Sequence, residues 1–425
     1  MKILVIGSGA REHALAWKLS GSVGVEKVYI APGNAGTRLV GENINIPAKD
    51  IRGLKDYALK NRIDLTVAGP ELPLTLGIAD EFEKAGLKLF GPSKKAAQIE
   101  GSKAFSKDLM ARYGIPTAEY RRFSGYAEAI KYIKAGHPPY VVKADGLAAG
   151  KGVIICGTMD EASDAVGLIM EKKAFGSAGD TIVIEEFLEG EEASFLAVTD
   201  GSTVIPLAPA QDHKAIGDGD KGPNTGGMGA YSPAPVLTPA LEKEIMDTIM
   251  VPAVKAMEAE GIPYKGVLYA GLMIKDNRPK ALEFNCRLGD PETQPILMRL
   301  EGDLAGLLVS AVEGRLEGVK LKWSERASVC VVMASKGYPG DYEKGKVIRG
   351  LEDASRLDDV MVFHAGTALK DNETITSGGR VLGVTALGDT IKDALERAYS
   401  AVDRISFDGA YYRKDIGKKA LGKNR

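Results

Sequence analysis

Hydrophobic positions in the first ninety residues form short apolar runs that alternate with helical segments. The runs at Lys2–Ile6, Lys27–Ile30, Asp64–Ala68 and Leu87–Phe90 each lead into a turn that contains glycine or proline. Residues 11–20 carry apolar side chains at helical spacing. Strands separated by helices predict right-handed crossovers and an open parallel sheet, Rossmann-like in kind. The turns at the carboxyl ends of such strands lie along one edge, where ligands bind.

The pattern changes after about residue 103 and becomes richer in hairpins. We expect strands and helices in this order: strands Tyr140–Ala144 and Val153–Cys156, a helix near 160–172, strand Thr181–Phe187, two strands within 193–210, a helix near 238–260, strands Gly266–Ile274 and Lys280–Cys286, and a helix near 303–313. Residues 211–233 are expected to form a long glycine-rich loop, which in a compact protein is typically functional. From Ser328 the chain is again rich in strands, and it closes with a helix near 389–404.

Composition narrows the class of protein. The 425 residues are 44% hydrophobic and 26% charged, which is ample for packed cores. Lys and Arg total 55 and Asp and Glu 57, a net charge of -2, so the basic excess of a nucleic-acid binder is absent. The apolar runs fall short of the roughly 18 residues of a membrane helix, and the N-terminus lacks the features of a signal peptide. Three cysteines form no disulfide or zinc pattern. We expect a cytoplasmic protein without nucleic-acid or membrane partners.

The first candidate site is the turn Gly7-Ser8-Gly9-Ala10-Arg11, which joins the first strand to the first helix. Backbone N–H groups at a helix start suit a phosphate, and Arg11 adds a charged donor. The dinucleotide fingerprint requires a third glycine where this chain has Glu12, which argues against a nicotinamide or flavin. A plain turn without a ligand has the same local pattern.

The second candidate is the hairpin Val142–Val153, which contains Lys143, Lys151 and several glycines. It leads into a strand and therefore differs from the strand–loop–helix phosphate loop. Glycines and alanines could still fold over a triphosphate that the lysines neutralise. Lys143 lies within an apolar strand, and a buried lysine requires an anionic partner. The alternative is a surface hairpin with solvated lysines.

Two further segments carry polar groups at strand spacing. Alternation along a strand places Glu283, Asn285 and Arg287 on one face, opposite Leu282 and Phe284. Carboxylate and amide oxygens are hard ligands that suit Mg²⁺, and arginine can hold a phosphate or carboxylate. An ordinary half-exposed strand has the same alternation.

The other segment, Ile184–Glu192, follows an apolar run with a cluster of glutamates. Its backbone could pair with an adenine edge and a carboxylate could bind ribose hydroxyls. Acidic clusters of this kind are also common in solvated turns.

Taken in order, these segments resemble the ATP-grasp superfamily and, within it, the family of phosphoribosylamine–glycine ligases. The stretches that carry the resemblance are Gly7–His13, Gly69-Pro70-Glu71, Lys143–Gly152, Gln211–Tyr231 and Glu283–Glu292. The resemblance implies ATP-dependent ligation of glycine to 5-phosphoribosylamine through a glycyl phosphate. The products would be glycinamide ribonucleotide, ADP and phosphate, in de novo purine biosynthesis.

The resemblance also implies roles for individual residues. Metal ligands for Mg²⁺, or Mn²⁺, would be Glu283 and Asn285. ATP contacts would come from Lys103, Lys143, Gly150, Lys151, Gly152, Glu185, Glu186, Phe187, Leu188, Glu191 and Glu192. The sugar phosphate or glycine would meet Gly9, Arg11, Glu12, Gly69, Pro70, Glu71, Gly289 and Asp290. Catalytic residues would be Asp212, Lys214 and Arg287.

The implied fold is α/β and α+β with three domains. These are an N-terminal parallel α/β substrate-binding domain at 1–103, an ATP-grasp domain at 104–327 with a flap near 116–190, and a small β-rich α+β domain at 328–425. We expect a monomer.

One departure from the wider superfamily is that strand Gly266–Ile274 has no acidic residue, where many members carry a further metal ligand. Two alternatives therefore stay open. One is another ATP-grasp carboxylate–amine ligase, and the other is a nucleotide-binding regulator without catalysis.

Overall fold

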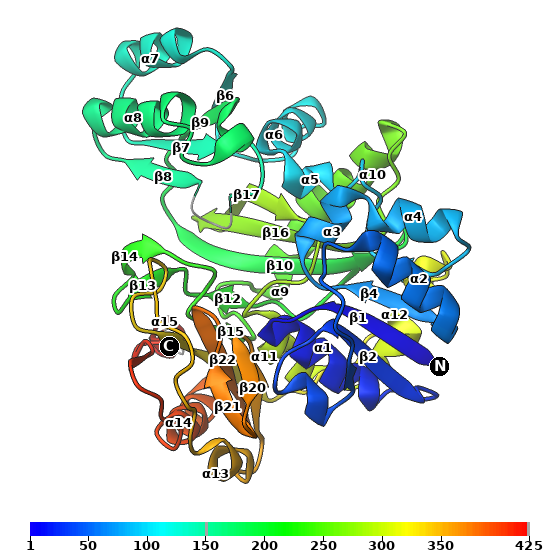
Figure 1. The fold of residues 1–425 in the computed structure, drawn as a ribbon. Helices are drawn as coiled ribbons and strands as arrows, with labels where there is room; N and C mark the ends of the chain where they lie inside the picture. The colour runs from blue at the N-terminus through cyan, green and yellow to red at the C-terminus, as the bar shows by residue number, and fades with distance from the viewer. Residues whose placement is uncertain (149–151, 423–425) are drawn as a thin grey trace.

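The computed structural model describes residues 1–148 and 152–422 (Figure 1). Its N-terminal part is a five-stranded sheet in the order β3-β2-β1-β4-β5, and every pair is parallel. The strands are β1 Lys2–Gly7, β2 Lys27–Pro32, β3 Glu42–Asn43, β4 Leu65–Ala68 and β5 Leu89–Phe90, and the helices are α1 Ala10–Ser20, η1 Thr37–Leu39, α2 Ile51–Asn61, α3 Glu71–Leu76 and α4 Ile78–Lys84. The predicted open parallel sheet is confirmed, although β5 is shorter than the predicted Leu87–Phe90.

The central strand β1 is buried on both faces, which explains its continuous apolar run. Ile3 and Val5 pack in one core with Leu15 and Leu19 of α1. The alternate residues, such as Leu4, pack in a second core with residues of α2 and α4. Because helices cover both faces, a ligand is expected to reach this sheet at its edges and strand ends.

A second, antiparallel sheet follows in the chain and is called the flap sheet here. Its order is β6-β9-β7-β8. Its strands are β6 Tyr120–Phe123, β7 Tyr140–Ala144, β8 Val153–Cys156 and β9 Ile182–Glu186, with helices α7 Tyr126–Ala135 and α8 Met159–Val166 and the short turns η2 Gly167–Glu171 and η3 Gly176–Gly179. One face packs on α7 and α8 in a small core of its own, seen at the top left of Figure 1.

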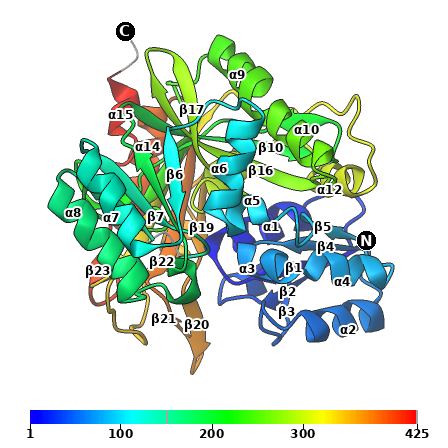
Figure 2. The same cartoon turned by 90° about the horizontal axis from the view of Figure 1, so that it is seen from above.

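A third sheet, also antiparallel and called the middle sheet here, has the order β11-β10-β16-β17. Its strands are β10 Glu191–Thr199, β11 Val204–Pro206, β16 Gly266–Lys275 and β17 Arg278–Asn285, and the accompanying helices are α9 Pro239–Ile245, η4 Met246–Met250, α10 Val251–Ala259, α11 Thr293–Arg299 and α12 Leu304–Val312. Two helices, α5 Gln98–Gly101 and α6 Lys103–Arg112, connect the N-terminal sheet to the flap sheet. Figure 2 shows α6 between the flap sheet and the middle sheet, and α6 contacts strands of both.

The C-terminal sheet contains strands from two distant parts of the chain. Its path is β12-β15-β18-β22-β19, with β23 paired to β18. Its strands are β12 Gln211–Asp212, β15 Gly229–Ser232, β18 Ala327–Ser335, β19 Val360–His364, β22 Arg380–Gly388 and β23 Ala410–Tyr411, beside the hairpins β13 Ala215–Gly217 with β14 Lys221–Asn224 and β20 Thr367–Lys370 with β21 Glu373–Thr376, and the helices α13 Leu351–Ser355, α14 Ile391–Val402 and α15 Lys418–Leu421.

The expectation of a long loop over 211–233 is wrong. Both ends of this segment are short strands, and β15 pairs with β18 from Gly229 opposite Val331 to Ser232 opposite Ser328. The region between them forms the hairpin β13–β14. Strand β12 pairs with β15 within the segment, and β15 takes its other partner, β18, from about a hundred residues further along the chain. Among the described residues, no helix combines the length and apolar character needed to cross a membrane.

Candidate active site

A cavity of about 670 Å³ lies where the flap sheet, the middle sheet, the N-terminal turns and the C-terminal part meet. Its wall contains most of the residues singled out in the sequence: Arg11, Pro70, Glu71, Lys103, Lys143, Gly152, Glu185, Glu186, Phe187, Leu188, Glu192, Asp212, Lys214, Glu283, Asn285, Arg287 and Asp290. The cavity thus brings Lys143 together with Glu283 and Asn285. Gly150 and Lys151 lie outside the described residues.

The end of the cavity formed by the two antiparallel sheets is called the lysine end here. The chain crosses from the flap sheet to the middle sheet through residues 187–190, between β9 and β10. Lys143 on β7 has the anionic partner that its burial requires, because its Nζ lies 2.9 Å from Glu185 Oε1. Lys103, at the start of α6, donates to the carbonyl of Gly146 at 2.9 Å. Two ammonium groups therefore approach the same cavity from different elements.

Strand β17 brings Glu283 and Asn285 to the floor of the cavity. Burial alone would raise the pKa of the Glu283 carboxyl, but Lys214, Lys143 and Lys103 hold it below its ordinary value. Glu283 is therefore a carboxylate at neutral pH. The predicted strict alternation is wrong, because Leu282 and Phe284 also line the cavity. At Leu282 the register with β16 contributes: it shifts between Gly271 and Leu272, which pair with Glu283 and Ala281, so Leu282 is skipped.

Arg287 lies just beyond β17 and is held by two carboxylates. Its Nη2 donates to Glu100 Oε1 at 2.9 Å, and its Nε lies 3.5 Å from Glu71 Oε2. The same Nη2 lies 3.3 Å from Asn285 Oδ1. Glu100 Oε2 accepts from the backbone N–H of Cys286 at 2.7 Å. Glu100 thus fixes the end of the strand that carries Asn285 and Arg287.

The glycine turn after β1 is occupied by a carboxylate of the chain itself. The Gly9 N–H donates to Glu12 Oε2 at 2.5 Å, and Arg11 Nε donates to Glu12 Oε1 at 2.6 Å. A Cβ at Gly69 would collide with Glu12 Oε1, so a side chain there would displace this carboxylate. Glu12 therefore braces two turns from behind, and Arg11, whose Nη1 donates to the Leu288 carbonyl at 3.0 Å, faces the cavity.

The C-terminal part contributes Arg380 from the start of β22. Its Nη2 lies 3.1 Å from Asp290 Oδ2, and its Nη1 donates to the carbonyls of Gly226 and Asp290 at 2.6 and 2.7 Å. Tyr338 accepts from the Gly226 N–H at 3.0 Å. These bonds hold the chain around Gly226 against the cavity. We call the end lined by Arg11, Arg287 and Arg380 the arginine end.

Between the two ends lies a pair of opposite charge at β12. Burial raises the pKa of the Asp212 carboxyl to about 7 against the opposing effect of Lys214, and Glu292 and Glu192 raise it further. Lys214 forms an ion pair with Glu192 at 2.9 Å, and its pKa stays well above the ordinary value despite burial. Asp212 can therefore exchange a proton near neutral pH, whereas Lys214 remains charged.

Comparison of the chain with known proteins identifies a family with this architecture. Three phosphoribosylglycinamide synthetase models match the chain: the N domain over residues 1–100, the ATP-grasp (A) domain over 101–293 and the C domain over 328–419. A phosphoribosylamine–glycine ligase of Vibrio parahaemolyticus is 53% identical over 428 residues, covering 100% of both chains. One from Escherichia coli is 56% identical and covers 99% of each.

The chain belongs to the phosphoribosylamine–glycine ligase family. The crystal structure of such a ligase from Thermotoga maritima superposes with a TM-score of 0.86 at 34% identity, covering 98% of this chain and 100% of that one. Both the resemblance seen in the sequence and the predicted fold class are thereby confirmed: an N-terminal parallel sheet, a central ATP-grasp region and a small C-terminal sheet. The protein is an enzyme of the ATP-grasp ligase class.

Five residues that the sequence suggested do not line the cavity in the described part of this ligase: Gly9, Glu12, Gly69, Glu191 and Gly289. Three of them are glycines that allow close approach of a carboxylate. A Cβ at Gly289, for example, would lie 2.5 Å from Glu292 Oε2. These three glycines therefore support the wall of the cavity without lining it.

Three charged residues of the wall were not predicted from the sequence: Glu100, Lys107 and Arg380. The position of Lys107 could have been predicted. It lies four residues after Lys103 on the same helix, so both side chains share one face. Glu100 and Arg380 reach the cavity only through tertiary packing.

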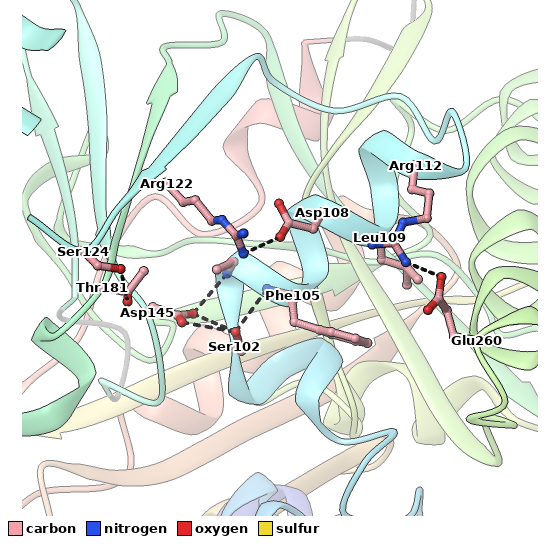
Figure 3. Close-up of a pocket in the computed structure, with 11 residues that line it drawn as sticks. Ser102, Phe105, Asp108, Leu109, Arg112, Arg122, Ser124, Asp145, Thr181 and Glu260 are labelled. Carbon is pink, nitrogen blue, oxygen red and sulfur yellow. Dashed lines mark hydrogen bonds and ion pairs between the residues drawn. The ribbon is translucent and has the colours of Figure 1, made fainter. Parts of the chain in front are cut away.

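A second pocket, of about 510 Å³, lies on the other side of α6 (Figure 3). Its charged side chains point toward one another, with Arg122 bound to Asp108 at 2.7 Å and Arg112 bound to Glu260. Asp145 accepts from Ser102 and from the Ala104 N–H, both at 3.0 Å. These groups satisfy one another. The larger cavity, by contrast, is lined by most of the residues singled out in the sequence. The larger cavity is therefore the candidate active site.

Proposed function

We propose that this chain ligates glycine to 5-phosphoribosylamine at the expense of ATP, through glycyl phosphate, giving glycinamide ribonucleotide, ADP and phosphate in de novo purine biosynthesis. The observation that carries the proposal is the convergence of Lys103, Lys143, Glu283 and Asn285 with Arg11 and Asp290 in one cavity. Family membership supports the choice of substrates, because the named relatives are phosphoribosylamine–glycine ligases.

ATP belongs at the lysine end in this proposal. The backbone of Glu186, Phe187 and Leu188 would bind the adenine edge, and Glu192, or Glu191 at the start of β10, would bind the ribose. Lys103 and Lys143 would contact the triphosphate. Gly152, before β8, would contact the phosphates, and Gly150 and Lys151 are expected to do so as well. A closed hairpin would exclude water, which protects an acyl phosphate from hydrolysis.

The residues present fit a divalent cation. Glu283 offers an ionised carboxylate and Asn285 an amide oxygen, both hard ligands. Among the described residues, no three His, Cys, Asp or Glu side chains are grouped so that they could hold a metal by themselves. The carboxylate of Glu283 and the amide oxygen of Asn285 suit Mg²⁺, with Mn²⁺ as the alternative, bound jointly by the protein and by nucleotide phosphates. Such a cation would supply charge neutralisation at the transferred phosphoryl group.

The remaining steps fall to side chains of the chain itself. Lys103 and Lys143 would neutralise the triphosphate so that the glycine carboxylate can attack the γ-phosphorus in line. Arg287, held rigidly by Glu100 and Glu71, would stabilise the acyl phosphate. The amine of phosphoribosylamine would then attack the carbonyl carbon, and phosphate would leave.

The proton lost by that amine requires an acceptor. Asp212 would take it, because burial raises the pKa of its carboxyl to about 7, near the working pH. Lys214 would orient the carboxylates around it. Arg11, Pro70, Glu71 and Asp290 would hold the sugar phosphate or glycine, with Gly9, Glu12, Gly69 and Gly289 supporting the turns.

We also propose the division into 1–103, 104–327 with a flap near 116–190, and 328–425. The matches to three family models and the separate flap core support it. Strands β12 and β15, however, pair with the C-terminal sheet. We propose a cytoplasmic monomer, and the three buried free cysteines, Cys156, Cys286 and Cys330, suit a reducing compartment.

A coupled assay for ADP, with ATP, glycine or phosphoribosylamine omitted in turn, tests the function. We expect ADP release only when all three are present, and no release when another amino acid replaces glycine. Turnover with a different acid or amine would favour another ATP-grasp ligase. ATP binding without any turnover would favour a regulator.

A further inference from the structure

Three charged side chains are buried together beneath the lysine end of the cavity. Lys107 of α6 and Glu185 of β9 are each 2% exposed, and Lys143 of β7 is 5% exposed. Glu185 lies between the two lysines, with Oε2 2.9 Å from Lys107 Nζ and Oε1 2.9 Å from Lys143 Nζ. All three line the cavity. One carboxylate is thus shared by two ammonium groups that come from different elements.

The lysines differ in what else they contact. Lys107 Nζ also donates to Thr117 Oγ1 at 2.7 Å, and Thr117 in turn donates to the Ala281 carbonyl at 2.6 Å. Lys143 Nζ has a weaker second contact, 3.3 Å from the Leu282 carbonyl next to Glu283. Each lysine thus has two protein acceptors, but both of those of Lys107 are close, whereas the second contact of Lys143 is long and leaves it the more available to a ligand.

The charges of this group do not cancel. Two ammonium groups and one carboxylate leave one net positive charge at the wall where the triphosphate is placed. If Lys107 were neutral, the whole charge of Glu185 would act on Lys143, and the attraction for an anion would fall. Coulomb interactions of this kind are strong in a poorly hydrated site, so one charge has a measurable effect on a polyanionic ligand.

We propose that Lys107 is a positioning residue for ATP binding, which keeps Lys143 available to the nucleotide phosphates by sharing the Glu185 carboxylate. The inference rests on the placement of ATP given under Proposed function. It adds a residue that does not touch the nucleotide. The quantity to measure is the preference of the site for ATP over adenosine, which carries no phosphate.

The competing explanation is that Lys107 only fastens α6 to the flap sheet. Loss of such a fastening would deform the adenine pocket and would weaken every adenine ligand alike. A charge effect would weaken ATP and leave adenosine, which carries no phosphate, unchanged. The ratio of the two dissociation constants therefore separates the explanations, even if the variant is less stable.

The experiment measures dissociation constants of ATP, with Mg²⁺, and of adenosine for the wild type and four variants. Lys107→Met removes the charge, and Lys107→Arg retains it. Lys107→Met with Glu185→Gln removes both charges and leaves Lys143 unopposed. Lys173→Met is the matched control, because Lys173 pairs with Asp180 at 2.6 Å on the outer surface of the same subdomain.

We expect Lys107→Met to raise the dissociation constant of ATP about tenfold, while that of adenosine changes less than about twofold. Lys107→Arg and Lys173→Met should keep the wild-type ratio, and the double variant should return it to within about threefold of wild type. Equal weakening of both ligands by Lys107→Met, or no recovery in the double variant, would overturn the inference while leaving the proposed function standing. A wild type that binds no ATP would overturn both.

A pH profile adds a second readout. Burial lowers the pKa of Lys107 to about 8, against the raising effect of Glu185 on β9 and Glu283 on β17 and with a lowering effect from Lys143 on β7. Loss of this proton between about pH 7 and 9 should weaken ATP binding to the wild type. The Lys107→Met protein should show no such step, and the same step in both proteins would contradict the inference.

Discussion

The lysine end and the arginine end of the cavity hold positive charge in different ways. At the lysine end, Lys103 and Lys143 each make one strong contact, and both keep donors for a ligand. At the arginine end, each guanidinium is already bound: Arg11 to Glu12, Arg287 to Glu100 and Arg380 to Asp290. The lysines are point charges on flexible stems, whereas the arginines are planar forks fixed by carboxylates.

The difference matches the tasks proposed for the two ends. A triphosphate changes its charge distribution during phosphoryl transfer, and ammonium groups act on it as point charges that require no fixed fork geometry. A glycine carboxylate and an amine that must meet at one carbon require fixed geometry, because small displacements are costly in rate. Substitutions at the lysine end should therefore act mainly on ATP and metal, and those at the arginine end on kcat or on the second substrate.

The largest effect should come from Glu283, on β17 at the lysine end. Glu283→Ala removes the proposed metal carboxylate and leaves Lys214, Lys143 and Lys103 without their shared anion. We expect kcat to fall about 10³-fold while the fold persists, as checked by circular dichroism. Activity like that of the wild type at saturating Mg²⁺ would contradict the assignment.

A smaller loss is expected when the arginine end loses its support. Glu100→Gln replaces one of two acceptors with an amide, so either Arg287 Nη2 or the Cys286 N–H loses its partner. We expect kcat to fall about 10²-fold with the KM for ATP changed less than about threefold. Steady-state kinetics with ATP varied would check both values.

The control for that variant is Glu260→Gln. Glu260 also pairs with an arginine, Arg112, but in the second pocket on the far side of α6. It should leave kcat within about twofold of the wild type. If Glu100→Gln raised the KM for ATP as strongly as it lowered kcat, the division between the two ends would not hold.

Arg11 should show a still smaller effect, confined to the second substrate. Arg11→Ala removes a guanidinium that faces the cavity beside Glu71 and Asp290. We expect the KM for phosphoribosylamine to rise about tenfold and that for ATP about twofold or less. Arg52→Ala, an exposed residue of α2, is the control. Equal increases in both KM values would remove the sugar-phosphate role.

The sequence allowed the lysine end to be predicted better than the arginine end, and the reason is physical. Lys143 and Glu283 lie on strands whose apolar runs are visible in the sequence, so the facing of their side chains follows from local alternation. The alternation failed at Leu282 and Phe284, which also line the cavity, and the register shift beside Leu282 depends on pairing with β16.

The arginine end depends on contacts between distant segments. Arg380 meets Asp290, ninety positions earlier, and Glu100 meets Cys286 and Arg287 nearly two hundred positions later. The glycine turn showed why a motif alone misleads. It has the pattern of a phosphate site, yet the side chain of Glu12, three residues further on, already accepts from the Gly9 N–H. Strands such as β14, Lys221–Asn224, are exposed throughout and have no apolar periodicity, so only their partners define them.

The smallest effect on activity, together with a clear effect on stability, should come from the contact between His13 and His364, which we call the histidine joint. His13 of α1 accepts through Nδ1 from the His364 N–H of β19 at 2.9 Å. Burial lowers the pKa of His13 to about 3, with a contribution from His364, and burial lowers that of His364 to about 4. The unfolded chain, with an ordinary histidine pKa of 6.5, therefore binds more protons than the native state below that pH.

The free energy of unfolding should then be fully retained above pH 6.5 and decrease as the pH falls toward 4, by about 3 kcal/mol for His13. His13→Asn offers an acceptor close to the position of Nδ1 and does not titrate, so it should flatten this dependence in urea unfolding while activity near pH 7.5 changes little. His137→Asn, at an exposed histidine, should not flatten it. If both variants left the slope as in the wild type, the carboxyl groups of the cavity rather than the histidine joint would govern acid unfolding, and the arginine end would be the weaker of the two ends at low pH.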